Sequence, residues 1–245
     1  MITSPDNEKL KLVRKLCQKK YREKLGLFVT EGEDLARAGL AAGAEPKFLL
    51  VHPDFEMEGE QVEPDLLDRA SGLASGTKVL GVWFQKWAEE MSEICVYLDQ
   101  LSDPGNMGTI IRSIDALLDA TLVVGPGTVD PYAPASVRAS MGSIFTQPLI
   151  KAPIEATPAP RVAMVASGGE PPAEHAAPVT ICLGSEREGL SAAVLNECEE
   201  AWTIPLREGR AESLNVAAAA AIAFERISSP SATGEPTQSE DESEE

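Results

Sequence analysis

Short, continuous apolar runs recur along the second half of the chain. Residues 94–98 and 179–183 are typical of strands that are buried on both faces of a parallel sheet. Between such runs, apolar residues return every three to four positions, as they do in a helix with one buried face. Strands that alternate with helices predict an α/β fold with a parallel sheet that helices cover on both faces.

This alternation divides the chain into parts. Residues 1–85 predict a small α/β domain, residues 86–93 a linker, and residues 94–228 a larger α/β domain. Residues 229–245 are acidic and lack aromatic and large aliphatic side chains, so we expect them to be disordered. The expected helices span 7–20, 35–43, 106–118, 135–141, 191–198 and 216–228, and the expected strands span 27–29, 48–51, 79–82, 94–98, 121–124, 145–149, 162–165, 179–183 and 202–204.

Composition and charge narrow the function. The four cysteines form no CxxC pair and the two histidines are isolated, so we expect reduced structural thiols and no metal site. No apolar run reaches the roughly 18–20 residues of a membrane span, and the opening residues do not resemble a signal peptide, so a cytoplasmic protein is expected. A net charge of −18 argues against nonspecific binding to nucleic acid.

Residues 9–24 depart from this acidic balance. Eight lysines and arginines lie there, and the only acidic side chain among them is Glu23. Two interpretations remain open, a localised electropositive site or one solvated helix face. The candidate nucleic-acid contacts in this stretch are Arg14, Lys15, Lys19, Lys20 and Arg22.

Two polar loops follow predicted strands, where open α/β sheets bind ligands. In the first, Asn106 can cap the next helix, Gly108 allows a close approach, and Arg112 lies early enough in that helix to favour an external partner. The alternative is an ordinary cap with a surface arginine. In the second, glycines bracket Glu186 at the edge of a cleft. The alternative there is a turn capped by Ser191.

A third loop precedes the most apolar helix of the chain. Backbone groups of Ile204, Leu206 and Leu214 can bind the edge of a flat heterocycle without any charged side chain. The alanine-rich run 216–224 requires another backbone to lie close against it. The alternative is a buried helix with Ser213 as its N-cap.

Taken in order, the three loops resemble the three motifs of the SpoU/TrmH family, which are RNA 2'-O-ribose methyltransferases of the SPOUT superfamily. The resemblance covers about residues 94–227, and residues 137–142 are similar to the family as well. The N-terminal part resembles the family's small L30e-like substrate-binding domain. The motifs read Asn106-x-Gly-x-x-x-Arg112, then Gly184-Ser-Glu186-x-x-Gly189-Leu190, then Ile204-Pro205 followed by Ser213-Leu214-Asn215.

The resemblance implies a C-terminal SPOUT α/β-knot fold with a deep trefoil knot, an exception to unknotted topology. It also implies S-adenosylmethionine bound in the knot and a homodimer with active sites near its interface. Arg112 then orients the ribose 2'-hydroxyl and a phosphate rather than acting as a base, because arginine stays protonated. The implied catalytic residues are Arg112, Asn106, Glu186, Ser213 and Asn215, and the implied cofactor contacts are Leu183, Gly184, Ile204, Leu206, Ser213 and Leu214.

The expected activity is methylation of a ribose 2'-hydroxyl in ribosomal RNA of the 23S type. A tRNA ribose methyltransferase and a noncatalytic RNA-binding homologue are the alternatives. A classical Rossmann methyltransferase is disfavoured because its glycine-rich loop follows the first strand, whereas the glycine-rich loop here comes late, at Gly184. The charged loop 207–212 departs from some relatives and leaves the cofactor contacts between Leu206 and Ser213 open.

Overall fold

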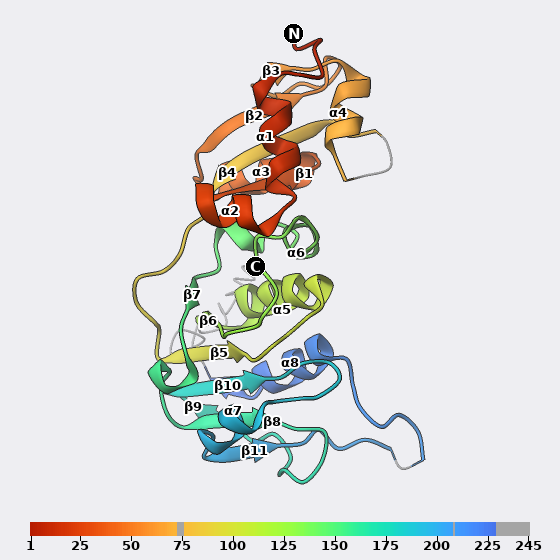
Figure 1. Cartoon of the computed structure of the whole chain (residues 1–245). Helices are drawn as coiled ribbons and strands as arrows, with labels where there is room; N and C mark the ends of the chain where they lie inside the picture. Colours follow the sequence, from red (N-terminus) through yellow and green to blue (C-terminus); the bar gives the residue numbers. More distant parts are fainter. Residues whose placement is uncertain (73–75, 208, 229–245) are drawn as a thin grey trace, which may run out of the picture.

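A computed structural model describes residues 1–72, 76–207 and 209–228. Two lobes are stacked on each other, each built around its own sheet (Figure 1). The expected disordered segment 229–245 lies outside the described residues. In the part that the structure describes, no helix is both long enough and apolar enough to cross a membrane.

The N-terminal lobe is the small α/β domain that the sequence predicts, and its sheet is mixed. β4 (Val79–Phe84) lies between β1 (Leu27–Glu31) and β2 (Pro46–Val51) and runs antiparallel to both. The short β3 (Glu60–Gln61) pairs with β2 in parallel at the edge. The alternation of helices and strands does not show which strand inserts between two others, so only the structure gives this strand order.

Helices cover both faces of this sheet. α1 (Glu8–Leu16) and α4 (Pro64–Ala70) pack on one face, while α3 (Glu33–Ala41) and the second lobe cover the other. The single helix expected over 7–20 is two, because the extended backbone of Gln18 separates α1 from α2 (Lys19–Leu25).

The C-terminal lobe confirms the predicted parallel sheet. Its six strands lie in the order β11-β8-β10-β5-β6-β7 and all run in parallel. The strand expected at 145–149 is instead a 3-10 turn, η1 (Ser143–Phe145), and only Leu149 begins the next strand. The strands are β5 (Ile94–Leu98), β6 (Thr121–Val124), β7 (Leu149–Lys151), β8 (Arg161–Met164), β10 (Val179–Leu183) and β11 (Glu200–Trp202), which ends two residues earlier than expected.

In the described residues, this lobe also contains four α-helices and a second 3-10 turn. Two of the helices, α5 (Pro104–Leu117) and α6 (Pro134–Ala139), pack closely together. A Cβ added to Gly108 would lie 2.3 Å from the carbonyl oxygen of Ser136, so α5 touches the backbone of α6. The closing helix ends near Phe224 rather than Ser228, because the chain turns to pair β12 (Ile227–Ser228) with β9 (His175–Ala176). These elements are α5 (Pro104–Leu117), α6 (Pro134–Ala139), η2 (Ile154–Ala156), α7 (Ala192–Asn196) and α8 (Val216–Phe224).

Contacts between the lobes are extensive. The buried guanidinium of Arg22 donates to the Asp130 carboxylate, with 2.7 Å between Nε and Oδ2. Phe28 packs on Tyr132 with 4.9 Å between ring centroids, and one core cluster contains residues of both lobes. The lobes therefore form one packed body, in which α5, α6 and η1 lie between the two sheets (Figure 1).

Candidate active site

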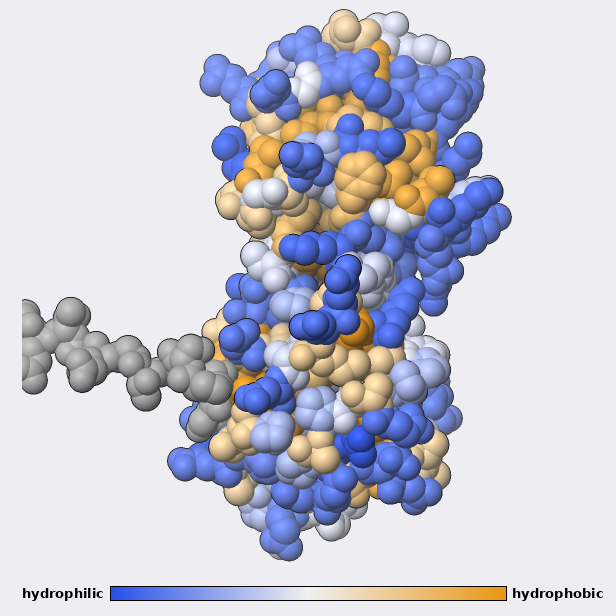
Figure 2. Space-filling model, turned by 90° about the vertical axis from the view of Figure 1, so that its left-hand side faces the viewer, coloured by the Kyte–Doolittle hydropathy of each residue, from blue (hydrophilic) through white to orange (hydrophobic). Residues whose placement is uncertain are grey.

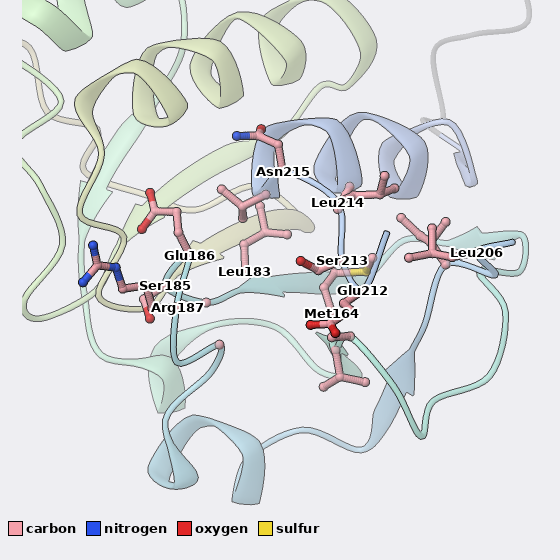
Figure 3. A pocket seen from close by; sticks show the side chains of 17 residues that line it. Met164, Leu183, Ser185, Glu186, Arg187, Leu206, Glu212, Ser213, Leu214 and Asn215 are labelled. Carbon is pink, nitrogen blue, oxygen red and sulfur yellow. The ribbon is translucent and has the colours of Figure 1, made fainter. Parts of the chain in front are cut away.

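A cavity of about 600 Å³ opens at the carboxyl ends of β8, β10 and β11. This is the edge at which parallel α/β sheets bind ligands. Figure 3 shows Glu186 and Asn215 at one side of the cavity and Leu206 and Leu214 toward the other. All six predicted cofactor contacts line it, namely Leu183, Gly184, Ile204, Leu206, Ser213 and Leu214.

Side chains of the three predicted motifs are joined by hydrogen bonds beside this cavity. The Asn215 amide Nδ2 donates to Asn106 Oδ1 over 2.9 Å. The Asn106 amide Nδ2 in turn donates to Glu186 Oε1 over 3.0 Å. Segments that are up to 109 residues apart in sequence are thus held in one fixed arrangement.

Glu186 receives further hydrogen bonds from the loop before α5. The Ser102 hydroxyl donates to Oε2 over 2.9 Å, and the Asp103 backbone N–H donates to Oε1 over 3.0 Å. Desolvation raises the pKa of this carboxyl, but the hydrogen bonds from Asn106, Ser102 and Asp103 outweigh it and lower the pKa to about 2. Glu186 is therefore ionised at neutral pH and fixes the β10 loop to the start of α5.

Two helix caps differ from those expected. α5 begins at Pro104, and its N-cap is Asp103, whose carboxylate accepts from the Asn106 N–H over 2.7 Å. Asn106 therefore lies within the first turn, which frees its side chain to bind Glu186 and Asn215. Likewise Asn215, not Ser213, caps α8 by accepting from the Ala217 N–H.

The loop between β10 and α7 is closed by its own backbone. Ser185 and Gly189 exchange two main-chain hydrogen bonds, of 2.9 and 3.1 Å. A Cβ on Gly184 would lie 2.1 Å from the Gly189 carbonyl carbon, so only glycine fits there. Ser191 caps α7, and its N–H donates to the buried carboxylate of Asp99 over 2.6 Å. The loop therefore lies at the edge of the cavity and also ends in a turn capped by Ser191, so both expected interpretations hold.

Arg112 lies further along α5 than expected. It is the ninth residue of the helix that starts at Pro104, so it lies in the third turn and not the first or second. The argument from the helix dipole does not apply at that distance. The side chain is exposed and is not among the residues that line the cavity. In the described part of the chain its guanidinium forms no hydrogen bond or ion pair.

The basic stretch is only partly available to a ligand. Lys15, Lys19 and Lys20 are exposed, whereas Arg14 donates to the carbonyl oxygens of Leu10 and Pro5. Arg22 is wrong as a candidate RNA contact, because it is 3% exposed and its guanidinium is held by Asp130 between the lobes. The helical periodicity of its neighbours did not reveal this, since the partner lies 108 residues away.

Some residues of the site were not predicted. The end of β8 contributes Met164, Val165 and Ala166 to the cavity. Strand order alone brings them there, because β8 lies between β10 and β11. Ser102 and Asp103 lie in a loop that the sequence did single out as a candidate, but their contacts with Glu186 depend on the fold.

Sequence comparison identifies the family. The family model described as SpoU rRNA Methylase family matches residues 93–225, and the one described as MRM3-like substrate binding domain matches residues 7–87. The chain belongs to the SpoU rRNA methylase family. The 23S rRNA (guanosine(2553)-2'-O)-methyltransferase RlmP of Bacillus subtilis (strain 168) is 30% identical over 242 residues, covering 90% of this chain and 96% of the relative.

Solved structures of the family share the fold across both lobes. An AdoMet-bound rRNA methyltransferase from Sinorhizobium meliloti matches with a TM-score of 0.79 and 30% identity, over 91% of this chain and 95% of that one. The SpoU methyltransferase AviRb from Streptomyces viridochromogenes, in complex with AdoMet, matches with a TM-score of 0.78 and 26% identity, over 90% and 96%. The SPOUT fold with an N-terminal substrate-binding lobe is thus confirmed.

The cavity suits S-adenosylmethionine (AdoMet), the cofactor bound in those two structures. Its volume lies within the roughly 300–1,000 Å³ of small-molecule sites. Apolar walls from Met164, Leu183 and Leu214 can hold a flat heterocycle. Within the described residues, the backbone N–H groups of Ile204, Leu206 and Leu214 donate to no other protein group, so they remain available to the edge of an adenine ring.

Proposed function

We propose that this protein transfers the methyl group of AdoMet to a ribose 2'-hydroxyl in ribosomal RNA of the 23S type. The observation that carries the proposal is that the second and third motif segments line one cavity and the first motif is joined to both beside it, through hydrogen bonds between Asn215, Asn106 and Glu186. The near full-length similarity to RlmP supports the choice of RNA and of reaction.

AdoMet supplies an electrophilic methyl group, so the protein has chiefly to position the attacking oxygen. Ile204, Leu206 and Leu214 hold the heterocycle through main-chain groups, while Ser213 lines the cavity beside them. The exposed guanidinium of Arg112 has the planar fork that binds a phosphate and orients the adjacent 2'-hydroxyl. The hydrogen bonds between Asn106, Glu186 and Asn215 hold α5 in a fixed position beside the cavity.

The proposal also includes the domain roles, the knot and the dimer that the family resemblance implies. Residues 1–85 act as the RNA-binding domain, residues 86–93 as the linker, and residues 94–228 as the methyltransferase domain. The C-terminal part is knotted around the cofactor, and two copies associate through this domain. Ile222 on the outward side of α8 is 42% exposed, which leaves an apolar side chain on that helix for a second copy.

The test combines Arg112→Ala with a matched variant, Arg37→Ala, on α3 of the other lobe. In Arg112→Ala we expect AdoMet affinity to stay unchanged while methyl transfer to ribosomal RNA falls about 100-fold, since a mispositioned nucleophile costs about that much. Arg37→Ala should change neither. Calorimetry with AdoMet, transfer of labelled methyl groups, and mapping of 2'-O-methyl sites provide the readouts.

One result would contradict the proposed reaction and another the role of Arg112. One is an intact fold that binds no AdoMet, which would leave a noncatalytic RNA-binding protein. The other is an Arg112→Ala enzyme with full activity, which would remove Arg112 from the site while leaving the reaction in place.

A further inference from the structure

A second cavity, of about 310 Å³, lies between the two lobes, and we call it the junction pocket. Aromatic residues make up half of its lining. Phe28, Trp83 and Tyr132 are each 1% exposed and belong to the packed interior, whereas Phe84 at its margin is 58% exposed. Phe145 of η1 packs on Trp83 with 4.8 Å between ring centroids. Residues of both lobes thus line the pocket, and Phe84 offers an open ring face at its margin.

The polar groups of the interior wall already have partners. The Tyr132 hydroxyl donates to the Lys86 carbonyl oxygen over 2.6 Å, and the Trp83 indole N–H donates to the Thr30 hydroxyl over 2.8 Å. Glu45 and Lys86 at the rim are exposed, and in the described part of the chain their side chains form no hydrogen bond or ion pair. A ligand that fits must therefore be flat and apolar on its faces, with donors and acceptors on its edge.

Lysines surround this aromatic surface. Lys47 Nζ lies 5.6 Å from the centroid of the Phe84 ring, and Lys151 Nζ lies 4.5 Å from that of Trp87. Lys86 lies between Phe84 and Trp87 in the chain. Lys151 Nζ lies 4.0 Å from the Glu23 carboxylate oxygen Oε1. On this side of the molecule, apolar side chains gather over the N-terminal lobe among hydrophilic ones (Figure 2). Stacking surface beside positive charge is the pattern that single-stranded nucleic acid binds.

The junction pocket also adjoins the helix that carries Arg112. The Thr146 hydroxyl, which follows η1, donates to the Asp115 carboxylate of α5 over 2.7 Å. Asp115 lies three residues after Arg112 and so on the same face of the helix. RNA held at Arg112 that continues along α5 toward its C-terminus therefore reaches η1, whose Ile144 and Phe145 line the pocket.

We propose that the junction pocket receives one unpaired base of the RNA substrate, from the strand that flanks the methylated ribose. The base stacks on the exposed ring of Phe84 at the margin of the pocket, Glu45 and Lys86 face its edge, and Lys47 and Lys151 face the neighbouring phosphates. The inference rests on the proposed function for the identity of the substrate, but it concerns recognition and not methyl transfer. Sequence-specific binding of RNA commonly works by stacking unpaired bases on aromatic side chains.

Phe84→Leu and Phe84→Trp separate stacking from mere apolar contact. With AdoMet present and salt fixed, we expect a short single-stranded RNA oligomer to bind Phe84→Leu about fivefold to 100-fold more weakly than the wild type, as loss of a stacked base predicts. Phe84→Trp should bind at least as well as the wild type. Fluorescence anisotropy gives the affinity, and crosslinks from thiouridine-containing RNA should map to residues 83–87.

Lys47→Ala and Arg37→Ala form the charge control, because each removes a cation beside a phenylalanine ring of the N-terminal lobe. Lys47→Ala should weaken RNA binding and reduce its salt dependence, whereas Arg37→Ala should not. Equal RNA affinity of the wild type and Phe84→Leu would overturn the inference, as expected if the pocket instead served a protein partner. That result would leave the proposed function intact, which methyl transfer by the wild type tests separately.

Discussion

The Glu186 carboxylate links the loop after β10 to the start of α5 through hydrogen bonds. Its hydrogen bonds come from Asn106 of the first motif and from Ser102 and Asp103 in the loop before it, and Asn215 joins through Asn106. A protonated carboxyl would lose acceptor capacity toward these donors. The geometry of the site therefore depends on the charge of Glu186.

This dependence gives a prediction about acid stability. The pKa of Glu186 is lowered to about 2 in the folded protein, from an ordinary value of 4.5. Its contribution to stability is therefore fully present above about pH 4.5 and is lost as the pH falls toward 2. Glu186→Gln should show a shallower loss of stability over this interval, measured as the urea midpoint at each pH. Glu188→Gln in the same loop is the control, and an unchanged slope in Glu186→Gln would contradict the assignment.

Residue types at the site were easier to predict than residue roles. Asn106, Glu186 and Asn215 were singled out, and the structure brings them together. The expected helix caps, Asn106 and Ser213, lie three and two residues from the true ones, Asp103 and Asn215, because several polar residues near a helix start can each cap it. Only the backbone geometry decides between such neighbours.

At the scale of the element, α5 is constrained on two sides. α8 packs against it with buried Ala217, Ala220 and Ala223, and α6 packs against it at Gly108. The alanine-rich run correctly predicted that another backbone lies close to α8. The sequence did not indicate that the close partner is the helix that carries Arg112.

Gly108→Ala tests this packing. Alanine favours a helix over glycine by about 1 kcal/mol, but its Cβ would lie 2.3 Å from the Ser136 carbonyl oxygen and 2.7 Å from the Ser140 nitrogen. Overpacking of this kind costs about 1–3 kcal/mol, so we expect a net loss of stability in urea unfolding. Thr109→Ala, at the exposed next position, should stay within about 0.5 kcal/mol of the wild type. A Gly108→Ala protein more stable than the wild type would show that α6 moves away freely.

At the scale of the whole molecule, a buried ion pair between Arg22 and Asp130 joins the two lobes. The side chains of Arg22 and Asp130 are 4% and 9% exposed, and Arg22 also donates to the Leu16 carbonyl oxygen. Asp130→Ala leaves a buried guanidinium without its partner, which costs about 3–5 kcal/mol. Urea unfolding measures this loss. Glu60→Gln, which breaks the half-exposed pair with Lys9, should cost at most about 1 kcal/mol.

The exposed part of the basic stretch gives a second prediction at this scale. Lys19→Glu together with Lys20→Glu should weaken RNA binding and lower its salt dependence by about 0.7 per lost phosphate contact, while AdoMet binding stays unchanged. Arg37→Glu, on another helix of the same lobe, controls for a charge reversal outside the basic stretch and should leave RNA binding unchanged. Titration of RNA at several salt concentrations measures the slope. An unchanged affinity would favour the solvated-face interpretation.

The sequence by itself determined the α/β class, the two-part organisation and the three loops that are joined at or beside the cavity. These follow from local signals, namely apolar periodicity, glycines in tight turns and polar residues after strands. The tertiary structure decided the insertion of β4 between β1 and β2, the burial of Arg22 against Asp130, and the placement of the β8 end in the cavity. Each of these depends on contacts between residues far apart in the chain, and a local pattern cannot specify which distant partner a side chain meets.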